Sequence, residues 1–134
     1  MQPDELKRIA VLQAMDHDAL ARFAAVLEEY NYADGQIVFA EDEPGDSMYF
    51  ILQGRVRIEK RARAVGGIQK TLAVLEAGDY FGEMALFDEK PRSASAVSSG
   101  SSRILRLAKV AFDGIQQQSG TAALSVLFAM IRTS

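Results

Sequence analysis

Residues 78–97 contain the side chains whose types and spacing best suit chemistry with an anion. Gly82 can form a tight turn, because glycine adopts the left-handed backbone conformations that such turns require. An apolar helix-forming run follows it, and the first N–H groups of a helix lack intrahelical partners and attract anions. Glu83 lies in the first turn of this run, and Arg92 follows a loop closed by Pro91. The pattern favours a site for a small ligand that carries one phosphate and nearby hydroxyl groups.

Arg92 and Glu83 are the charged candidates of this stretch. A guanidinium stays charged and offers a planar fork of donors that fits the oxygens of a phosphate. The alternative for Arg92 is a surface arginine in a turn. The Glu83 carboxylate could be held by Arg92, which would keep the ligand-free site electrostatically neutral. Alternatively, Glu83 only stabilises the start of the helix, an effect of about 0.3–1 kcal/mol.

Small residues surround these two charges. A side chain at Gly82 would obstruct the approach of a ligand, and the small Ala85 leaves its backbone N–H within reach of a phosphate oxygen. The alternative is that both residues only form a turn and a helix. Ser93 can offer its hydroxyl and its amide to the same phosphate.

The composition excludes several classes of protein. A chain of 134 residues predicts one domain with a single core. Its net charge of -3 argues against broad binding of nucleic acid, which favours a basic surface. No apolar run approaches the roughly 20 residues that a membrane span requires, so we expect no membrane contact. The polar, acidic N-terminus does not match a secretory signal, and we expect a cytoplasmic location.

The sequence also offers little for catalysis or metal binding. It contains no cysteine, and His17 is its one histidine, which excludes thiolate chemistry and a histidine-rich metal site. The acidic turn at residues 41–46 lacks the regular spacing of a calcium loop. Because we find no nucleophile–base pair, we expect a non-enzymatic protein without a metal.

The elements that position these residues begin with helices over about residues 3–30. Pro3 and Asp4 suit the first turn of a helix. Asp16 predicts the N-cap of a second helix, which the sequence pattern extends to Tyr30.

Short strands are predicted between about residues 31 and 108. The expected strands are Gln36–Ala40, Ser47–Gln53, Arg55–Glu59, Lys70–Leu75, Ala94–Val97 and Arg103–Leu107. Gly54 is expected to end one of them, and Gly66-Gly67 to form a hairpin turn. The serines at residues 98–102 predict a loop. Many short strands separated by turns are typical of a sandwich or a barrel.

Helices return over about residues 109–132. Val110, Phe112 and Ile115 begin the first, and Ser119-Gly120 interrupts it. Residues 121–132 are almost wholly apolar, and such a helix needs burial on more than one side. This segment could pack as ordinary core, or act as a lid, a homodimer seam or a contact for an effector domain.

Two motifs in this order resemble the cyclic nucleotide-binding domain family, which includes catabolite activator proteins, protein kinase A regulatory subunits and cyclic nucleotide-gated channels. Residues 45–56 read GDSMYFILQGRV, similar to the family pattern G-D-x-x-Y-x-I-x-x-G-x-V. Residues 81–86 (FGEMAL) and 91–94 (PRSA) are similar to its phosphate-binding cassette, here 81–93. The step from Glu83 to Arg92 matches the common form without insertion. Where many members read R-x-A-T-V, this chain reads RSASA.

The resemblance implies a fold and a set of ligand contacts. The fold is mainly β: an eight-stranded, jelly-roll-like β-roll (a double-stranded β-helix) with flanking helices. Arg92 would bind the cyclic phosphate, and Glu83 would accept a hydrogen bond from the ribose 2′-hydroxyl. The expected ligand-binding residues are Gly82, Glu83, Met84, Ala85, Arg92, Ser93 and Ala94. Threonine in place of Ser93 tends to accompany guanine selectivity in the family, so serine favours cyclic AMP over cyclic GMP.

These observations predict a regulatory sensor that binds a cyclic nucleotide and moves its C-terminal helices in response. One alternative is a structural or interaction module that has lost or changed its ligand. Another is the sensor part of a larger transcription regulator or channel. From this chain alone we expect no nucleic-acid partner.

Overall fold

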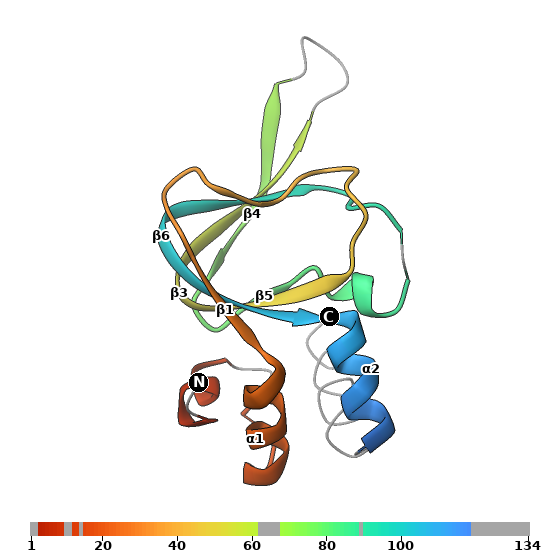
Figure 1. The fold of residues 1–134 in the computed structure, drawn as a ribbon. Helices are drawn as coiled ribbons and strands as arrows, with labels where there is room; N and C mark the ends of the chain where they lie inside the picture. Colours follow the sequence, from red (N-terminus) through yellow and green to blue (C-terminus); the bar gives the residue numbers. More distant parts are fainter. Residues whose placement is uncertain (1–2, 10–11, 14, 62–67, 89, 119–134) are drawn as a thin grey trace.

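Two long strands, β3 (Ser47–Arg61) and β6 (Ser95–Ala108), form the centre of the fold. They pair antiparallel along most of their length. The computed structural model of the chain describes residues 3–9, 12–13, 15–61, 68–88 and 90–118. Figure 1 shows the sheet curving round on itself, with helices on one side of it. The predicted fold class, mainly β with flanking helices, is confirmed.

Four shorter strands complete a six-stranded sheet of order β1-β6-β3-β4, with β2 on β6 and β5 on β3. They are β1 (Glu28–Tyr32), β2 (Ile37–Phe39), β4 (Gln69–Glu76) and β5 (Tyr80–Phe81). Strands β3 and β4 form an antiparallel hairpin that extends beyond the body of the roll in Figure 1. Its predicted turn, Gly66-Gly67, lies outside the described residues.

The sheet has six described strands where the resemblance implied eight, because β3 and β6 continue through two predicted breaks. Gly54 does not end its strand. It adopts φ +92°, and the pairing of β3 with β6 shifts register on either side of Gln53. Glycine therefore bends the strand here without interrupting it.

The predicted serine loop at residues 98–102 is also wrong, since these residues belong to β6. Ser98 and Ser102 are buried, and their hydroxyl oxygens lie 2.7 Å apart. The Ser102 hydroxyl also donates to the Arg55 carbonyl oxygen at 3.1 Å. Because these two hydroxyl groups are hydrogen-bonded, both serines can be buried within β6.

The N-terminal helices are shorter than the sequence predicted. Residues 3–8 form a 3₁₀ helix, η1 (Pro3–Arg8). Helix α1 (His17–Val26) begins at the predicted cap, where the Asp16 carboxylate accepts the Ala19 N–H at 2.8 Å. It ends at Val26, four residues before the predicted end at Tyr30.

Residues 28–32 form β1 because pairing with β6 outweighs the helical pattern. Glu29 accepts from Arg103 at 3.0 Å, and Glu28 accepts from Arg106 at 2.6 Å. Hydrogen bonding to Arg103 holds the pKa of Glu29 below its usual value. These cross-strand partners lie more than seventy residues away in the sequence, so the local pattern could not indicate them.

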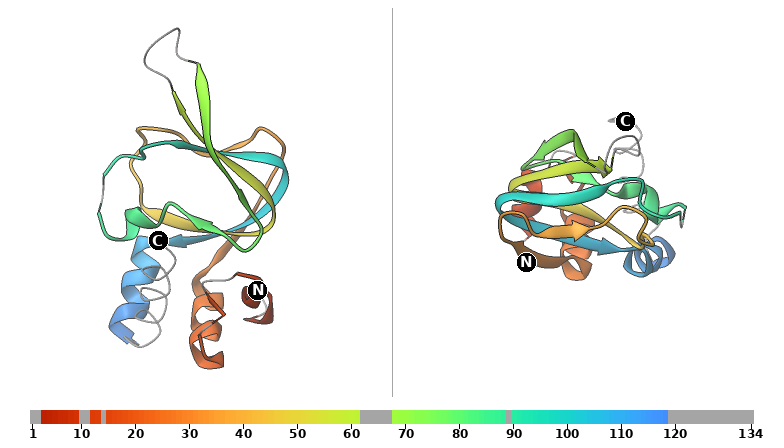
Figure 2. Two further views of the ribbon diagram at one scale, coloured as in Figure 1. Left: turned by 180° about the vertical axis from the view of Figure 1, so that it is seen from behind. Right: turned by 90° about the horizontal axis from the view of Figure 1, so that it is seen from above.

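Helix α2 (Lys109–Gln118) follows β6 directly, at the predicted boundary between roll and helices. Phe112 and Ile115 of α2 are buried in one apolar core with Leu20 and Phe23 of α1, on the helical side of the sheet. A second core, which includes Tyr49, lies inside the roll. Figure 2 shows α1 and α2 on the same side of the sheet.

The expected apolar helix at residues 121–132, with its lid or dimer role, lies outside the described residues, as does the interruption at Ser119-Gly120. Within the described ranges, no helix is long and apolar enough to cross a membrane.

Candidate functional site

The predicted turn and helix start are present after β5. Gly82 adopts φ +74°, and a single 3₁₀ turn, η3 (Glu83–Leu86), follows it. Ala85 and Leu86 are buried and anchor this turn to the roll. The Ala85 N–H donates to the Gly82 carbonyl oxygen at 3.3 Å, so this amide already has a partner in the ligand-free structure.

The acidic loop at residues 41–46 holds the backbone of Arg92 in place. The Asp42 N–H donates to the Arg92 carbonyl oxygen, and the Arg92 N–H donates to the Glu43 carbonyl oxygen, both at 2.8 Å. Pro44 and Pro91 form an isolated antiparallel bridge beside these bonds. This loop thus fixes the point where the chain returns to the Gly82 turn.

The Arg92 side chain is buried, with 8% of its surface exposed, so the alternative of an ordinary surface arginine is wrong. Its Nη1 donates to the Gly82 carbonyl oxygen at 3.1 Å, and its Nη2 donates to the Ser47 carbonyl oxygen at 2.7 Å. Its Nε is buried and has no hydrogen-bond partner among the described residues. Burial lowers the pKa of this guanidinium, against the opposing effect of nearby Tyr49 and carboxylates. A buried cation with an unused donor suits an anionic ligand.

Two aromatic rings lie beside the guanidinium, and a third packs against them. Arg92 Cζ lies 4.0 Å from the centroid of the Phe39 ring and 5.9 Å from that of Tyr49. The rings of Tyr49 and Phe81 stack with centroids 5.3 Å apart. Burial raises the pKa of the Tyr49 hydroxyl above its usual value. The ring faces stabilise the desolvated charge of Arg92.

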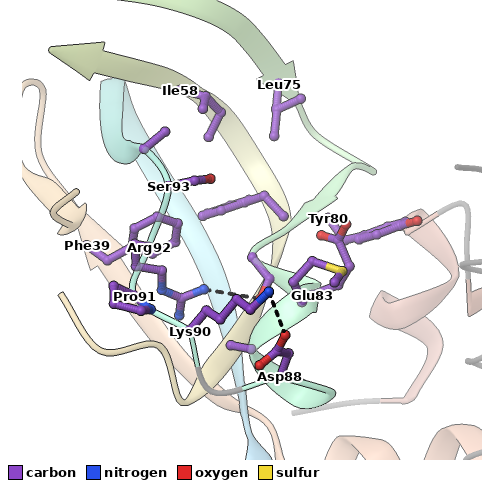
Figure 3. Close-up of a pocket in the computed structure, with 15 residues that line it drawn as sticks. Phe39, Ile58, Leu75, Tyr80, Glu83, Asp88, Lys90, Pro91, Arg92 and Ser93 are labelled. Atoms are coloured by element: carbon purple, nitrogen blue, oxygen red, sulfur yellow. Dashed lines mark hydrogen bonds and ion pairs between the residues drawn. The ribbon is translucent and has the colours of Figure 1, made fainter. Parts of the chain in front are cut away.

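A pocket of about 500 Å³ opens over this arginine (Figure 3). Its volume lies in the range of small-molecule sites, roughly 300–1,000 Å³. All of the predicted site residues line it: Gly82, Glu83, Met84, Ala85, Arg92, Ser93 and Ala94. Ala85, Arg92 and Ala94 are buried, while Met84 and Ser93 are exposed. The structure therefore brings the two predicted halves of the cassette to one cavity.

Glu83 is half-buried and lines the same pocket. Among the described residues, no ion pair joins it to Arg92, so the alternative in which Arg92 holds its carboxylate is not observed here. At the rim, Lys90 forms an ion pair with Asp88 at 3.4 Å. The pocket thus carries two cations and two carboxylates on its described lining residues.

The far wall of the pocket is apolar and comes from the β3–β4 hairpin, through Ile58 and Leu75 (Figure 3). Sequence reasoning did not assign these residues to the site. The other lining residues that it did not assign are Phe39, Tyr80, Phe81, Asp88, Lys90 and Pro91. The alternation of Val56 and Ile58 could have indicated an inward-facing side chain. Asp88 and Lys90 lie within the cassette, and their position between Glu83 and Arg92 was the available signal.

In the described part of the chain, no three His, Cys, Asp or Glu side chains gather in a way that could hold a metal ion.

Comparison with known proteins matches the part of the chain that contains the pocket. A family profile described as the cyclic nucleotide-binding domain matches residues 29–119, which include the whole of the pocket lining. The chain belongs to the cyclic nucleotide-binding domain family. The resemblance drawn from the two sequence motifs is therefore confirmed.

Two curated relatives show where such domains occur. The chain is 37% identical over 93 residues to a "CRP-like cAMP-activated global transcriptional regulator" of Mycobacterium tuberculosis, covering 69% of this chain and 41% of that protein. It is 32% identical over 111 residues to a "cAMP-dependent protein kinase regulatory subunit" of Dictyostelium discoideum, covering 81% of this chain and 33% of that protein. The chain thus matches less than half the length of these relatives.

A solved structure supports the fold of this cyclic nucleotide-binding domain over nearly its full length. The N-terminal domain of a transcriptional regulator from Streptomyces coelicolor superposes with a TM-score of 0.84 at 28% identity. The match covers 97% of this chain and 91% of that one.

Proposed function

We propose that the pocket binds cyclic AMP and that the domain is a regulatory sensor without enzymatic activity. In this proposal the Arg92 guanidinium binds the cyclic phosphate through its unused donors, and Glu83 accepts a hydrogen bond from the ribose 2′-hydroxyl. Ser93 adds a hydroxyl beside the phosphate. The base would lie against the apolar wall of Ile58 and Leu75.

The observation that carries this proposal is the division of one pocket into a buried cation and an apolar wall. Arg92 provides the cation, and Ile58 and Leu75 provide the wall. A cyclic nucleotide has the same division, with an anionic phosphate at one end and a flat base at the other. Some relatives are named as cAMP-activated or cAMP-dependent, and one from Drosophila melanogaster as cGMP-dependent, so the choice of cyclic AMP rests on the first group together with serine at position 93.

The wider role is part of the same proposal. Because the matched relatives are much longer, we propose that this domain is the sensor of a larger regulator, located in the cytoplasm. The competing hypothesis is an interaction module that has lost or changed its ligand. The retained Arg92, buried with an unpartnered Nε, favours the sensor.

Calorimetric titration of the chain with cyclic AMP and with cyclic GMP tests the ligand. We expect saturable binding of cyclic AMP at one site, with a preference over cyclic GMP of about tenfold or more, equal to about 1.4 kcal/mol. Absence of binding of either nucleotide at concentrations up to about 1 mM, an affinity weaker than about −4 kcal/mol, would favour the competing hypothesis.

We propose that ligand binding at the cassette changes the position of α2 and that this change is the regulatory output. Phe87, immediately after η3, contacts Phe112 of α2 in an edge-to-face arrangement with ring centroids 6.2 Å apart. A ligand that draws η3 toward Arg92 would move Phe87 and change this contact. Packed elements shift between discrete arrangements more readily than they deform, so α2 would change its position on the roll.

Amide hydrogen exchange measured with and without cyclic AMP tests this output. We expect the exchange rates of the α2 amides at residues 109–118 to change on binding, together with those of residues 82–88. Amides of the β1–β6 pairing lie away from the pocket and serve as the internal control. If cyclic AMP protects the cassette but leaves α2 unchanged, this route to the output is wrong.

A further inference from the structure

The Arg92 guanidinium already has hydrogen-bond partners before any ligand arrives. Two of its N–H groups donate to backbone carbonyls. Three carboxylates, those of Asp46, Glu43 and Glu83, also act on it electrostatically. An incoming phosphate also meets two carboxylates on the described lining of the pocket, those of Glu83 and Asp88. A second cation would offset the repulsion between these carboxylates and the phosphate.

Lys90 is the other cation among the described residues that line the pocket. It lies two residues before Arg92, on the same returning segment of the cassette. Its side chain is 82% exposed, and its Nζ lies 3.4 Å from the Asp88 Oδ2. Figure 3 shows the amine of this side chain turned toward Asp88. The amine is thus at the pocket, but a carboxylate holds it.

The pairing of Lys90 with Asp88 is easily exchanged. Ion pairs between exposed side chains contribute little to stability, because water screens them and holding two side chains together costs entropy. A lysine ammonium is a compact charge on a flexible four-carbon stem, so it can turn from one anion to another without movement of the backbone.

We propose that Lys90 is a second phosphate-binding cation of this pocket and that Asp88 holds it aside until the ligand binds. The inference rests on the proposed function, and it adds a ligand contact outside the motif residues. Asp88 is a positioning residue in this scheme, since it competes with the ligand for Lys90. The Asp88 carboxylate therefore lowers the affinity of the pocket for cyclic AMP, and removal of this carboxylate should raise the affinity.

Titration of the full chain with cyclic AMP tests the proposal in four forms: wild type, Lys90→Met, Asp88→Asn and the double variant. We expect Lys90→Met to weaken binding by about 3- to 10-fold and to reduce its dependence on salt. We expect Asp88→Asn to strengthen binding by about 2- to 5-fold. In the double variant this gain should disappear, because Asp88 acts through Lys90.

Two controls separate a ligand contact from a structural role. Lys70→Met removes an exposed lysine of β4 outside the pocket, and it should leave both affinity and salt dependence unchanged. Lys90→Arg should retain most of the wild-type affinity, because the charge is kept.

The outcomes distinguish the two levels of the proposal. If the wild type binds cyclic AMP and Lys90→Met binds it equally well, the role of Lys90 is wrong but the proposed function stands. A gain from Asp88→Asn that persists in the double variant overturns the role of Asp88. Wild type that binds no cyclic AMP overturns the proposed function and the inference with it.

Discussion

Replacement of Arg92 by alanine should weaken the binding of cyclic AMP by roughly 30- to 5,000-fold. Truncation of one partner of a buried, hydrogen-bonded charge pair costs about 2–5 kcal/mol. The buried guanidinium is the main cation that the pocket offers to a phosphate, and its Nε is the unpartnered donor. Calorimetric titration measures the effect directly.

Two further variants show whether this loss comes from the ligand contact. Arg92→Lys keeps the charge but loses the planar fork and its stacking on Phe39, so we expect an intermediate affinity. Arg55→Ala removes an exposed arginine of β3 that pairs with Glu76 and does not line the pocket, and it should bind normally. Because Arg92→Ala also removes one donor to each of the Ser47 and Gly82 carbonyls, its fold should be checked by thermal melting. A folded Arg92→Ala variant with wild-type affinity would show that the phosphate contact is wrong.

Replacement of Gly54 by alanine should reduce the free energy of unfolding by roughly 2–6 kcal/mol. The backbone at Gly54 has φ +92°, which a residue with a side chain adopts only with strain. A Cβ atom would also lie 2.5 Å from the Ser101 carbonyl oxygen and 2.6 Å from the Ser102 hydroxyl oxygen. Neither atom can retreat easily, because the Ser102 hydroxyl is bonded within the sheet. Urea unfolding gives the magnitude.

Gly100→Ala is the matched control for this effect. Gly100 has a similar backbone, with φ +76°, but a Cβ there would meet nothing within 4 Å. This variant should lose only the backbone contribution, about 1–3 kcal/mol. Equal losses in the two variants would mean that the contact with β6 does not matter.

The cassette was predictable because its parts lie close together in the sequence and each carries its own chemistry. Gly82 has the left-handed backbone of a tight turn, which glycine adopts readily and which its residue type alone indicates. Asp16 caps α1 by accepting a hydrogen bond from Ala19, three positions along the chain. Side chains of these types indicate their structure without knowledge of the fold.

The residues that were not predicted depend on partners far along the chain. Ile58 and Leu75 line the pocket because the hairpin folds over the cassette, and no local pattern shows which residue faces a cavity. Glu29 was assigned to a helix because its partner, Arg103, is distant. Ser98 was assigned to a loop because the residue opposite it in the sheet, Val56 of β3, is also distant in the sequence. In each case the tertiary contact outweighed the local preference.

The position of β6 also determines when the domain can form. This strand is the last of the described strands in the sequence, yet it pairs with β1, β2 and β3. An ion pair between Arg103 and Glu5 joins residues that are 98 positions apart. During synthesis, β1 and β2 therefore leave the ribosome before β6, the strand with which they form hydrogen bonds. The roll therefore cannot close before β6 is available, and the phosphate pocket and the contact with α2 cannot be completed before it closes.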